Sequence, residues 1–216
     1  GGGIPALSAG DIHLLSLDAG QTARFLATGT TDLSGMRIFS GDGKVAVFAG
    51  SPGTSLPGPG FAGYNDYLEE QLPPRTAWGM DVAAVKFRPR GDEVDVYRIM
   101  ADKNGTTVNV EGDITDTYVL NEGEFVQFTT DGDFRATASE AILVAHGMVA
   151  SSLVGGVVDP EMWPGNFVSS NCGGGVASAS DMGDPALSFL TPTEQFRNDY
   201  VFLTPYTYGW DVLTLV

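Results

Sequence analysis

The stretch GKVAVFAG at residues 43–50 recurs as EAILVAHG at residues 140–147, and this repeated hydrophobic strand decides the fold. Both stretches are short, rich in apolar and β-branched residues, and closed by a glycine, which is typical of a β-strand that ends in a turn. The closing glycines, Gly50 and Gly147, are 97 positions apart. A strand that occurs twice at this distance indicates a unit of roughly 100 residues present in two copies.

Two further blocks recur in the same order along the chain. LDAGQ at residues 17–21 matches LNEGE at residues 120–124, a displacement of 103 positions. A third block is displaced by 118 positions and pairs Asp66, Leu72-Pro73-Pro74, Trp78 and Asp81 with Asp184, Leu190-Thr191-Pro192, Phe196 and Asp199. Three blocks in one order predict an internal duplication.

These repeats predict an all-β protein of two tandem, internally duplicated β-sandwich-like units, with a multi-bladed β repeat array as the alternative. We expect the first unit at residues 1–100 and the second at 101–216. The larger displacement of the third block places an insertion in residues 148–183 of the second copy. Such a loop on a rigid β frame often carries binding function, and a surface insertion without function is the alternative.

Local patterns add specific elements to this prediction. Residues 66–72 (DYLEEQL) predict a short helical turn, because Asp66 has Glu69 three residues later and Pro73-Pro74 ends the segment. The predicted strands are 12–17, 36–39, 45–48, 94–100, 106–110, 125–129, 141–145 and 200–203.

The charge balance excludes several classes of partner. The chain has 27 acidic and 11 basic residues, a net charge of −16, which repels the phosphates of nucleic acids and of anionic membranes. No apolar stretch reaches the roughly 18 residues that cross a bilayer, so we expect no membrane insertion. Cys172 is the single cysteine, so neither an intramolecular disulfide nor a cysteine–histidine zinc site is expected.

The residues that could carry catalysis are few. Of the two histidines, His13 lies in an apolar run and is expected to pack or to lie on an edge strand. His146 ends a predicted strand and could approach a loop site. A serine–histidine–aspartate triad through it stays open, although no GxSxG elbow accompanies it.

Two short motifs have simpler explanations than cofactor or metal binding. GPGFAG at residues 58–63 fits the GxGxxG pattern, but prolines interrupt it and no parallel βαβ unit follows. The Asp-Gly pairs at Asp131 and Asp42 fit β-turns as well as calcium ligands. We therefore expect no enzyme, no cofactor and no metal.

The repeated blocks also resemble a known family. The segments 35–50, 66–79, 95–110 and 183–202 are similar to the N-terminal domain of the IgG Fc-binding protein family, in a bacterial member. The most specific part is EQLPP at residues 70–74, followed by Trp78-Gly79. The resemblance implies a secreted, non-catalytic β module of adhesion-like or mucus-type proteins, joined to further domains of its parent chain. Members often carry a cysteine on each side of the loop before this motif, whereas residues 51–65 have none.

The sequence thus predicts a non-catalytic binding or adhesion module, secreted or on the cell surface, that recognises an extracellular protein or glycan. Binding to immunoglobulin itself is not implied. The alternatives are a structural spacer repeat of a larger surface protein and a glycan-acting hydrolase, which needs two carboxylates across a cleft. Aromatic loop residues with adaptable polar neighbours suit recognition. The predicted binding residues are Tyr64, Asp66 and Tyr67 in the first copy and Trp163 and Asn166 in the insertion.

Overall fold

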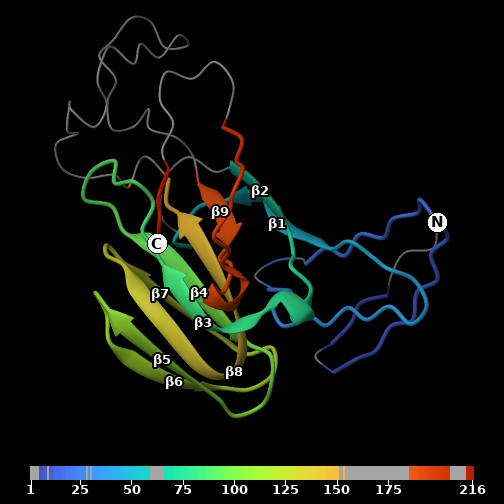
Figure 1. Ribbon diagram of the computed structural model, residues 1–216. Helices are drawn as coiled ribbons and strands as arrows, with labels where there is room; N and C mark the ends of the chain where they lie inside the picture. Colours follow the sequence, from blue (N-terminus) through green and yellow to red (C-terminus); the bar gives the residue numbers. More distant parts are fainter. Residues whose placement is uncertain are drawn as a thin grey trace, which may run out of the picture. The chain divides into compact units, whose positions relative to one another are not determined.

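The structure is a computed structural model in which the strands lie in one part of the chain (Figure 1). The chain separates into two compact units, Gly1–Met36 and Arg37–Val216. In the first unit, the described backbone forms turns and extended segments without strand pairing. The residues that the structure describes are 5–8, 10–27, 29, 31–58, 66–150, 153, 185–204 and 213–216.

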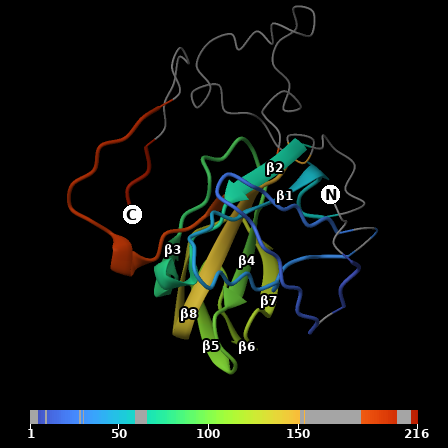
Figure 2. The same ribbon diagram turned by 90° about the vertical axis from the view of Figure 1, so that its right-hand side faces the viewer.

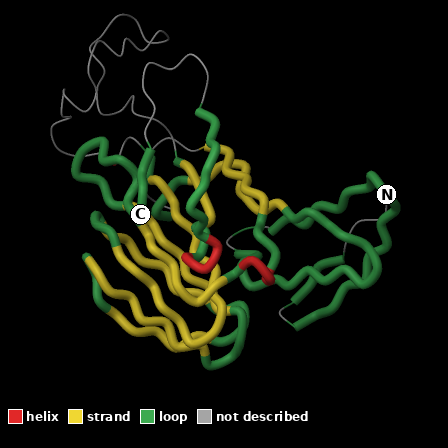
Figure 3. The backbone as a smooth tube through the Cα atoms, in the orientation of Figure 1, coloured by secondary structure: helices red, strands yellow, loops and turns green. Residues whose placement is uncertain are grey.

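The described part of the second unit is almost entirely β (Figure 3), which confirms the predicted all-β class. Seven strands form one antiparallel sheet: β3 (Gly79–Ala84), β4 (Asp95–Ala101), β5 (Thr106–Gly112), β6 (Asp116–Leu120), β7 (Phe125–Thr130), β8 (Phe134–Met148) and β9 (Ala186–Phe189). A second sheet pairs β1 (Phe48–Thr54) with β2 (Asp66–Gln71). The two described 3-10 turns are η1 (Arg75–Ala77) and η4 (Thr193–Gln195).

The 15-residue strand β8 organises the large sheet. Its first half pairs with β3 and β5, and its second half pairs with β4 and β9. β6 extends the sheet beyond β5, and β7 extends it beyond β4. Figure 2 shows β8 running beside β4 and β5. A register shift in the β3–β8 pairing, between Gly79 and Asp81, marks an irregularity between these two strands.

The core lies among the side chains that these strands turn inward. Residues in β5 alternate between buried and more exposed positions, as expected for a strand with one face on a core. Tyr97 of β4 packs edge-on against Phe134 of β8, with ring centroids 4.7 Å apart. The buried cluster comprises Val82, Ala84, Tyr97, Ile99, Ala101, Val108, Val110, Leu120, Phe134, Ala136, Ile142 and Val144.

The strand predictions are confirmed between residues 94 and 145 and fail toward both ends of the chain. The strands predicted at 94–100, 106–110, 125–129 and 141–145 are confirmed as β4, β5, β7 and part of β8. The strands predicted at 12–17, 36–39 and 200–203 are wrong, since the structure gives these residues no strand pairing. Of the strand predicted at 45–48, only Phe48 lies in β1.

The predicted helical turn at 66–72 is also wrong, because this segment is the strand β2. Its backbone pairs with β1 from Phe48↔Gln71 to Ser51↔Leu68. Leu68 is buried while its neighbours Tyr67 and Glu69 are exposed, which suits a strand with one covered face. Pairing with β1 thus overrides the weak local capping signal, and Pro73-Pro74 follow the strand as expected.

The two strand pairs that contain the repeated motifs have equivalent registers. The β1–β2 and β8–β9 pairs match at the displacements of 97 and 118 positions found in the sequence. The match continues past both pairs, since Leu72 N donates to Val47 O at 2.8 Å and Leu190 N donates to Val144 O at 2.9 Å. The equivalent pairs are Phe48↔Gln71 with Ala145↔Phe189, Ala49↔Glu70 with His146↔Ser188, Gly50↔Glu69 with Gly147↔Leu187, and Ser51↔Leu68 with Met148↔Ala186.

Tandem duplication as such stays a prediction, as does the division into residues 1–100 and 101–216. The seven-stranded sheet contains strands from both sides of residue 100, because β3 and β4 pair with β8. The boundary expected near residue 100 therefore runs through this sheet.

Candidate functional site

The two copies of the proline motif adopt the same local structure. η1 follows β2 after Pro74, and η4 follows β9 after Pro192. Both prolines have extended backbone, with φ of −62° and −69°. Proline fixes φ and has no N–H for a strand ladder, so it ends each strand and starts a turn. Each turn is closed by a bond to its proline carbonyl, from Ala77 N at 2.8 Å and from Gln195 N at 2.9 Å.

The two turns are joined by hydrogen bonds and by close packing. The Gln195 side-chain amide donates to the carbonyl of Ala77. The backbone N–H of Met80 donates to Glu194 Oε1 at 2.7 Å. A Cβ atom at Gly79 would lie 2.4 Å from Pro192 Cβ. Glycine at position 79 therefore allows β3 to approach η4 closely.

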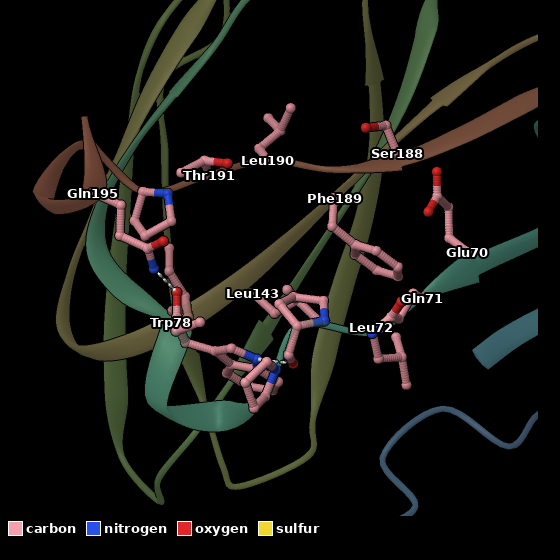
Figure 4. Close-up of a pocket in the computed structure, with 15 residues that line it drawn as sticks. Glu70, Gln71, Leu72, Trp78, Leu143, Ser188, Phe189, Leu190, Thr191 and Gln195 are labelled. Carbon is pink, nitrogen blue, oxygen red and sulfur yellow. Dashed lines mark hydrogen bonds between the residues drawn. The ribbon is translucent and has the colours of Figure 1, made fainter. Parts of the chain in front are cut away.

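A cavity of about 290 Å³ lies beside these turns (Figure 4). Figure 4 shows Glu70 and Ser188 toward one end and Trp78 and Gln195 toward the other. The first motif lines it with Glu70, Gln71, Leu72, Pro73, Pro74, Ala77 and Trp78, the second with Ser188, Phe189, Leu190, Thr191, Pro192 and Gln195, and β8 with Ile142 and Leu143.

The chemistry of this cavity suits an apolar group with polar neighbours. Leu72, Trp78 and Phe189 provide apolar and aromatic surface, and each is partly exposed. The Trp78 indole N–H donates to Pro73 O at 3.3 Å, which restrains the ring. Ligand pockets for whole small molecules occupy about 300–1,000 Å³, so this cavity fits one large side chain or a short chain segment.

Ion pairs hold the elements that carry the cavity. Arg75 of η1 donates to Glu122 Oε1 at 2.9 Å and to the backbone carbonyl of Asp102 at 2.7 Å, and it also pairs with the Asp102 carboxylate. Arg135 of β8 donates two hydrogen bonds to the Asp81 carboxylate of β3, from Nε at 2.8 Å and from Nη2 at 2.6 Å. This hydrogen bonding lowers the pKa of Asp81 against the opposing effect of desolvation. The Arg75 bonds join η1 beside the cavity to Asp102 and Glu122 in loops of the large sheet, and the Arg135–Asp81 pair joins two strands within that sheet.

His146 packs in the core, contrary to the hypothesis that it faces a loop site. Its side chain is 2% exposed, and its Nε2 lies 2.7 Å from Asp95 Oδ2. The imidazole is stacked between Phe87 and Tyr97, with centroid distances of 3.8 and 4.5 Å. Burial raises the pKa of the Tyr97 hydroxyl. A histidine enclosed in this way acts as a structural group. The other histidine, His13, is half-buried and lies in extended backbone without strand pairing.

Two of the five predicted binding residues lie in the part of the chain that the structure describes. Asp66 and Tyr67 lie at the start of β2 and are exposed, and Glu70 and Gln71 at its other end line the cavity. Tyr64, Trp163 and Asn166 lie outside the described residues, as do Cys172 and most of residues 148–183. The GxGxxG segment is described at Gly58 alone.

Sequence reasoning therefore named Asp66 and Tyr67 of the β2 segment as binding residues and missed the cavity at its other end. The signal was present in the third repeated block, whose leucine–proline motifs and Trp78 form much of the wall. Nothing in the sequence showed that the two copies of the motif meet, because that contact joins segments 118 positions apart.

Groups of metal-binding side chains and long apolar helices are both absent from the described residues. No group of three or more histidine, cysteine, aspartate or glutamate side chains there could hold a metal ion. The helices of the same part of the chain are too short to cross a bilayer.

A family model described as IgGFc binding protein matches residues 1–216, the whole chain. The chain therefore belongs to the IgGFc binding protein family, a family of protein-binding modules, in agreement with the resemblance at the repeated motifs. Comparisons with curated proteins and with solved structures gave no match.

Proposed function

We propose that this member of the IgGFc binding protein family is a non-catalytic extracellular module that binds a partner protein through the cavity between its two proline motifs. The proposal rests on the observation that both leucine–proline motifs line one partly aromatic cavity. Protein interfaces commonly anchor one large side chain in such a pocket, which then dominates the binding energy. We place the module at the cell surface or in secretion, joined to further domains of its parent chain.

The charge of the chain supports a basic partner surface. The net charge is −16, and Glu70 and Glu194 lie on or beside the two motifs. Opposite charge on a partner raises the association rate and selects its orientation, while the apolar anchor provides affinity. An aromatic or aliphatic side chain flanked by lysine or arginine is therefore the partner chemistry that the cavity favours.

The test is a binding measurement with the IgG Fc fragment, the target in the family description, and with a glycan array as the second class of probe. Two variants change the cavity in opposite ways: Trp78→Ala removes a wall, and Ser188→Tyr fills the space. We expect each to weaken Fc binding at least about tenfold, the loss typical of truncating a hot-spot contact.

Val119→Ala is the matched control, because Val119 is exposed on β6 and does not line the cavity. It should leave binding unchanged. Circular dichroism melts show whether each variant is folded. Equal losses in Val119→Ala and in both cavity variants, or binding of glycans instead of Fc, would contradict the proposed protein site.

A further inference from the structure

Equivalent elements of the two motif copies contact each other directly. β2 contacts its counterpart β9, and the η4 side chain of Gln195 bonds to Ala77, the residue 118 positions earlier in η1. The cavity is also lined in equivalent pairs, such as Leu72 with Leu190 and Pro74 with Pro192. Contact between equivalent surfaces is the mark of a closed two-fold arrangement, whereas an open array joins unlike surfaces. These are the contacts that a local two-fold relation between the two motifs would produce.

A two-fold relation between the motifs would give the β3–β8 pairing beside them a counterpart. β3 pairs with β8 through Ala83↔Arg135 and Val82↔Ala136. At the displacement of 118 positions, residues 81–84 (DVAA) correspond to residues 199–202 (DYVF). Phe134-Arg135 correspond to Met36-Arg37. The first copy has one more residue here, because Arg37 precedes Gly50 by 13 positions and Arg135 precedes Gly147 by 12. The counterpart of the β3–β8 pairing would therefore join residues 199–202 to residues 37–39.

Charge and exposure both favour this pairing. The Arg135–Asp81 ion pair has its counterpart in Arg37 and Asp199, which carry the same opposite charges. The two segments also expose large apolar side chains, with Phe39 at 81% and Val201 at 98%. Arg37 Nη1 lies 3.4 Å from Glu122 Oε1. Both side chains are exposed, and such surface ion pairs contribute little to stability. The two segments thus carry opposite charges, and each exposes apolar surface that pairing would cover.

We propose that residues 199–202, which have no strand pairing in the described structure, dock on residues 37–39 of the same chain as an antiparallel strand pair, with Val201 opposite Arg37 and Tyr200 opposite Ile38. The Arg37 guanidinium then binds the Asp199 carboxylate, as Arg135 binds Asp81. Docking removes the apolar side chains from water, which stabilises the pair. It also fixes the chain that leaves η4, so the second wall of the cavity is held from both ends.

The test uses engineered disulfides in a Cys172→Ser background. Arg37→Cys with Val201→Cys places thiols at directly opposed positions. Arg135→Cys with Ala83→Cys is the positive control, because these residues are partners in the β3–β8 register. Lys44→Cys with Val201→Cys is the off-register control. After oxidation, the cross-link is located by non-reducing gel electrophoresis and peptide mass spectrometry.

We expect the 37–201 pair to cross-link within the monomer to the same extent as the positive control and at least about fivefold more than the off-register pair. Disulfide-linked dimers would assign the docking to a second copy and overturn the proposal. Equal yields at positions 37 and 44 would also overturn it. Hydrogen exchange on the unaltered chain is independent of these substitutions, and paired amides at 199–202 should exchange about tenfold more slowly than those at 213–216.

Discussion

The turn at residues 17–21 and its counterpart at residues 120–124 have the same local structure, but only the second joins two strands. Gln21 N donates to Asp18 O at 3.0 Å, and Glu124 N donates to Asn121 O at 2.9 Å. In the same turns, Asp18 N donates to Gln21 Oε1 at 2.9 Å, and Asn121 N donates to Glu124 Oε2 at 2.8 Å. In the second region the turn links β6 to β7, whereas no strand forms beside the first among the described residues. Turn chemistry is therefore local, and strand formation depends on a partner.

In the second region β6 pairs with β5 and β7 pairs with β4, and β8 lies between β5 and β4. β8 also pairs with β3 and β9, so each of these four strands has its backbone hydrogen-bonded to β8. The corresponding strand of the first region is continued only from Phe48 onward, in β1. Similar patterns of apolar residues thus give different structures when the long central strand lacks paired strands on both edges. The predictions below test this difference, beginning with the largest expected effect.

The largest difference should lie between Ile142 and its counterpart Val45. Ile142 is 1% exposed in the core, and Val45 is 53% exposed. Ile142→Ala should lower the free energy of unfolding by about 2–5 kcal/mol, because it leaves a cavity among packed side chains. Val45→Ala should stay within about 0.5 kcal/mol, as an exposed substitution does. Urea unfolding measures both, and a cost at Val45 as large as at Ile142 would remove the difference between the regions.

The buried histidine should produce the next largest effect. His146→Leu removes the imidazole that contacts Asp95 Oδ2 and leaves a buried carboxyl without that partner. Phe87 N still donates to the same oxygen at 2.8 Å, so the variant loses one of the two hydrogen bonds of a buried carboxyl group, a cost of about 1–3 kcal/mol. The control is His13→Leu, since His13 is half-buried outside any strand and should cost little. If His146→Leu unfolds at the same urea concentration as the unaltered chain, the polar pair contributes nothing to the second region.

The same comparison shows what the sequence could predict. Strands β4, β5 and β7 were predictable because their alternating or β-branched residues agree with the pairing that forms. β2 was mistaken for a helical turn, because Asp66 and Glu69 fit a local cap while the decisive pairing with β1 is non-local. The cavity was beyond prediction for the same reason. Its walls come from motifs far apart in the chain, and no local pattern shows that η1 meets η4.

Glycine substitutions in the two equivalent turns should separate local from shared stability. Gly20 and Gly123 both have positive φ, at 82° and 75°. Alanine in this left-handed conformation costs roughly 1–2 kcal/mol. Gly123→Ala should lower global unfolding stability by this amount, because its turn joins two paired strands. Gly20→Ala should leave the unfolding midpoint of the sheet unchanged, since no paired strands flank that turn. Equal shifts of the two midpoints would indicate that both turns unfold with the sheet.

The smallest effect should be the pH dependence of the Arg135–Asp81 pair. Hydrogen bonds from Arg135 lower the pKa of Asp81 in the folded chain, against desolvation. A lowered pKa favours the folded state above the normal carboxyl range, and this contribution disappears as the pH falls through the folded value. Asp81→Asn should therefore destabilise the protein at neutral pH and lose its effect in acid. Asp131→Asn, at an exposed turn, is the control. Unfolding curves between pH 7 and about pH 2 measure the difference, and a difference that grows in acid would show that the pair does not stabilise the β3–β8 contact.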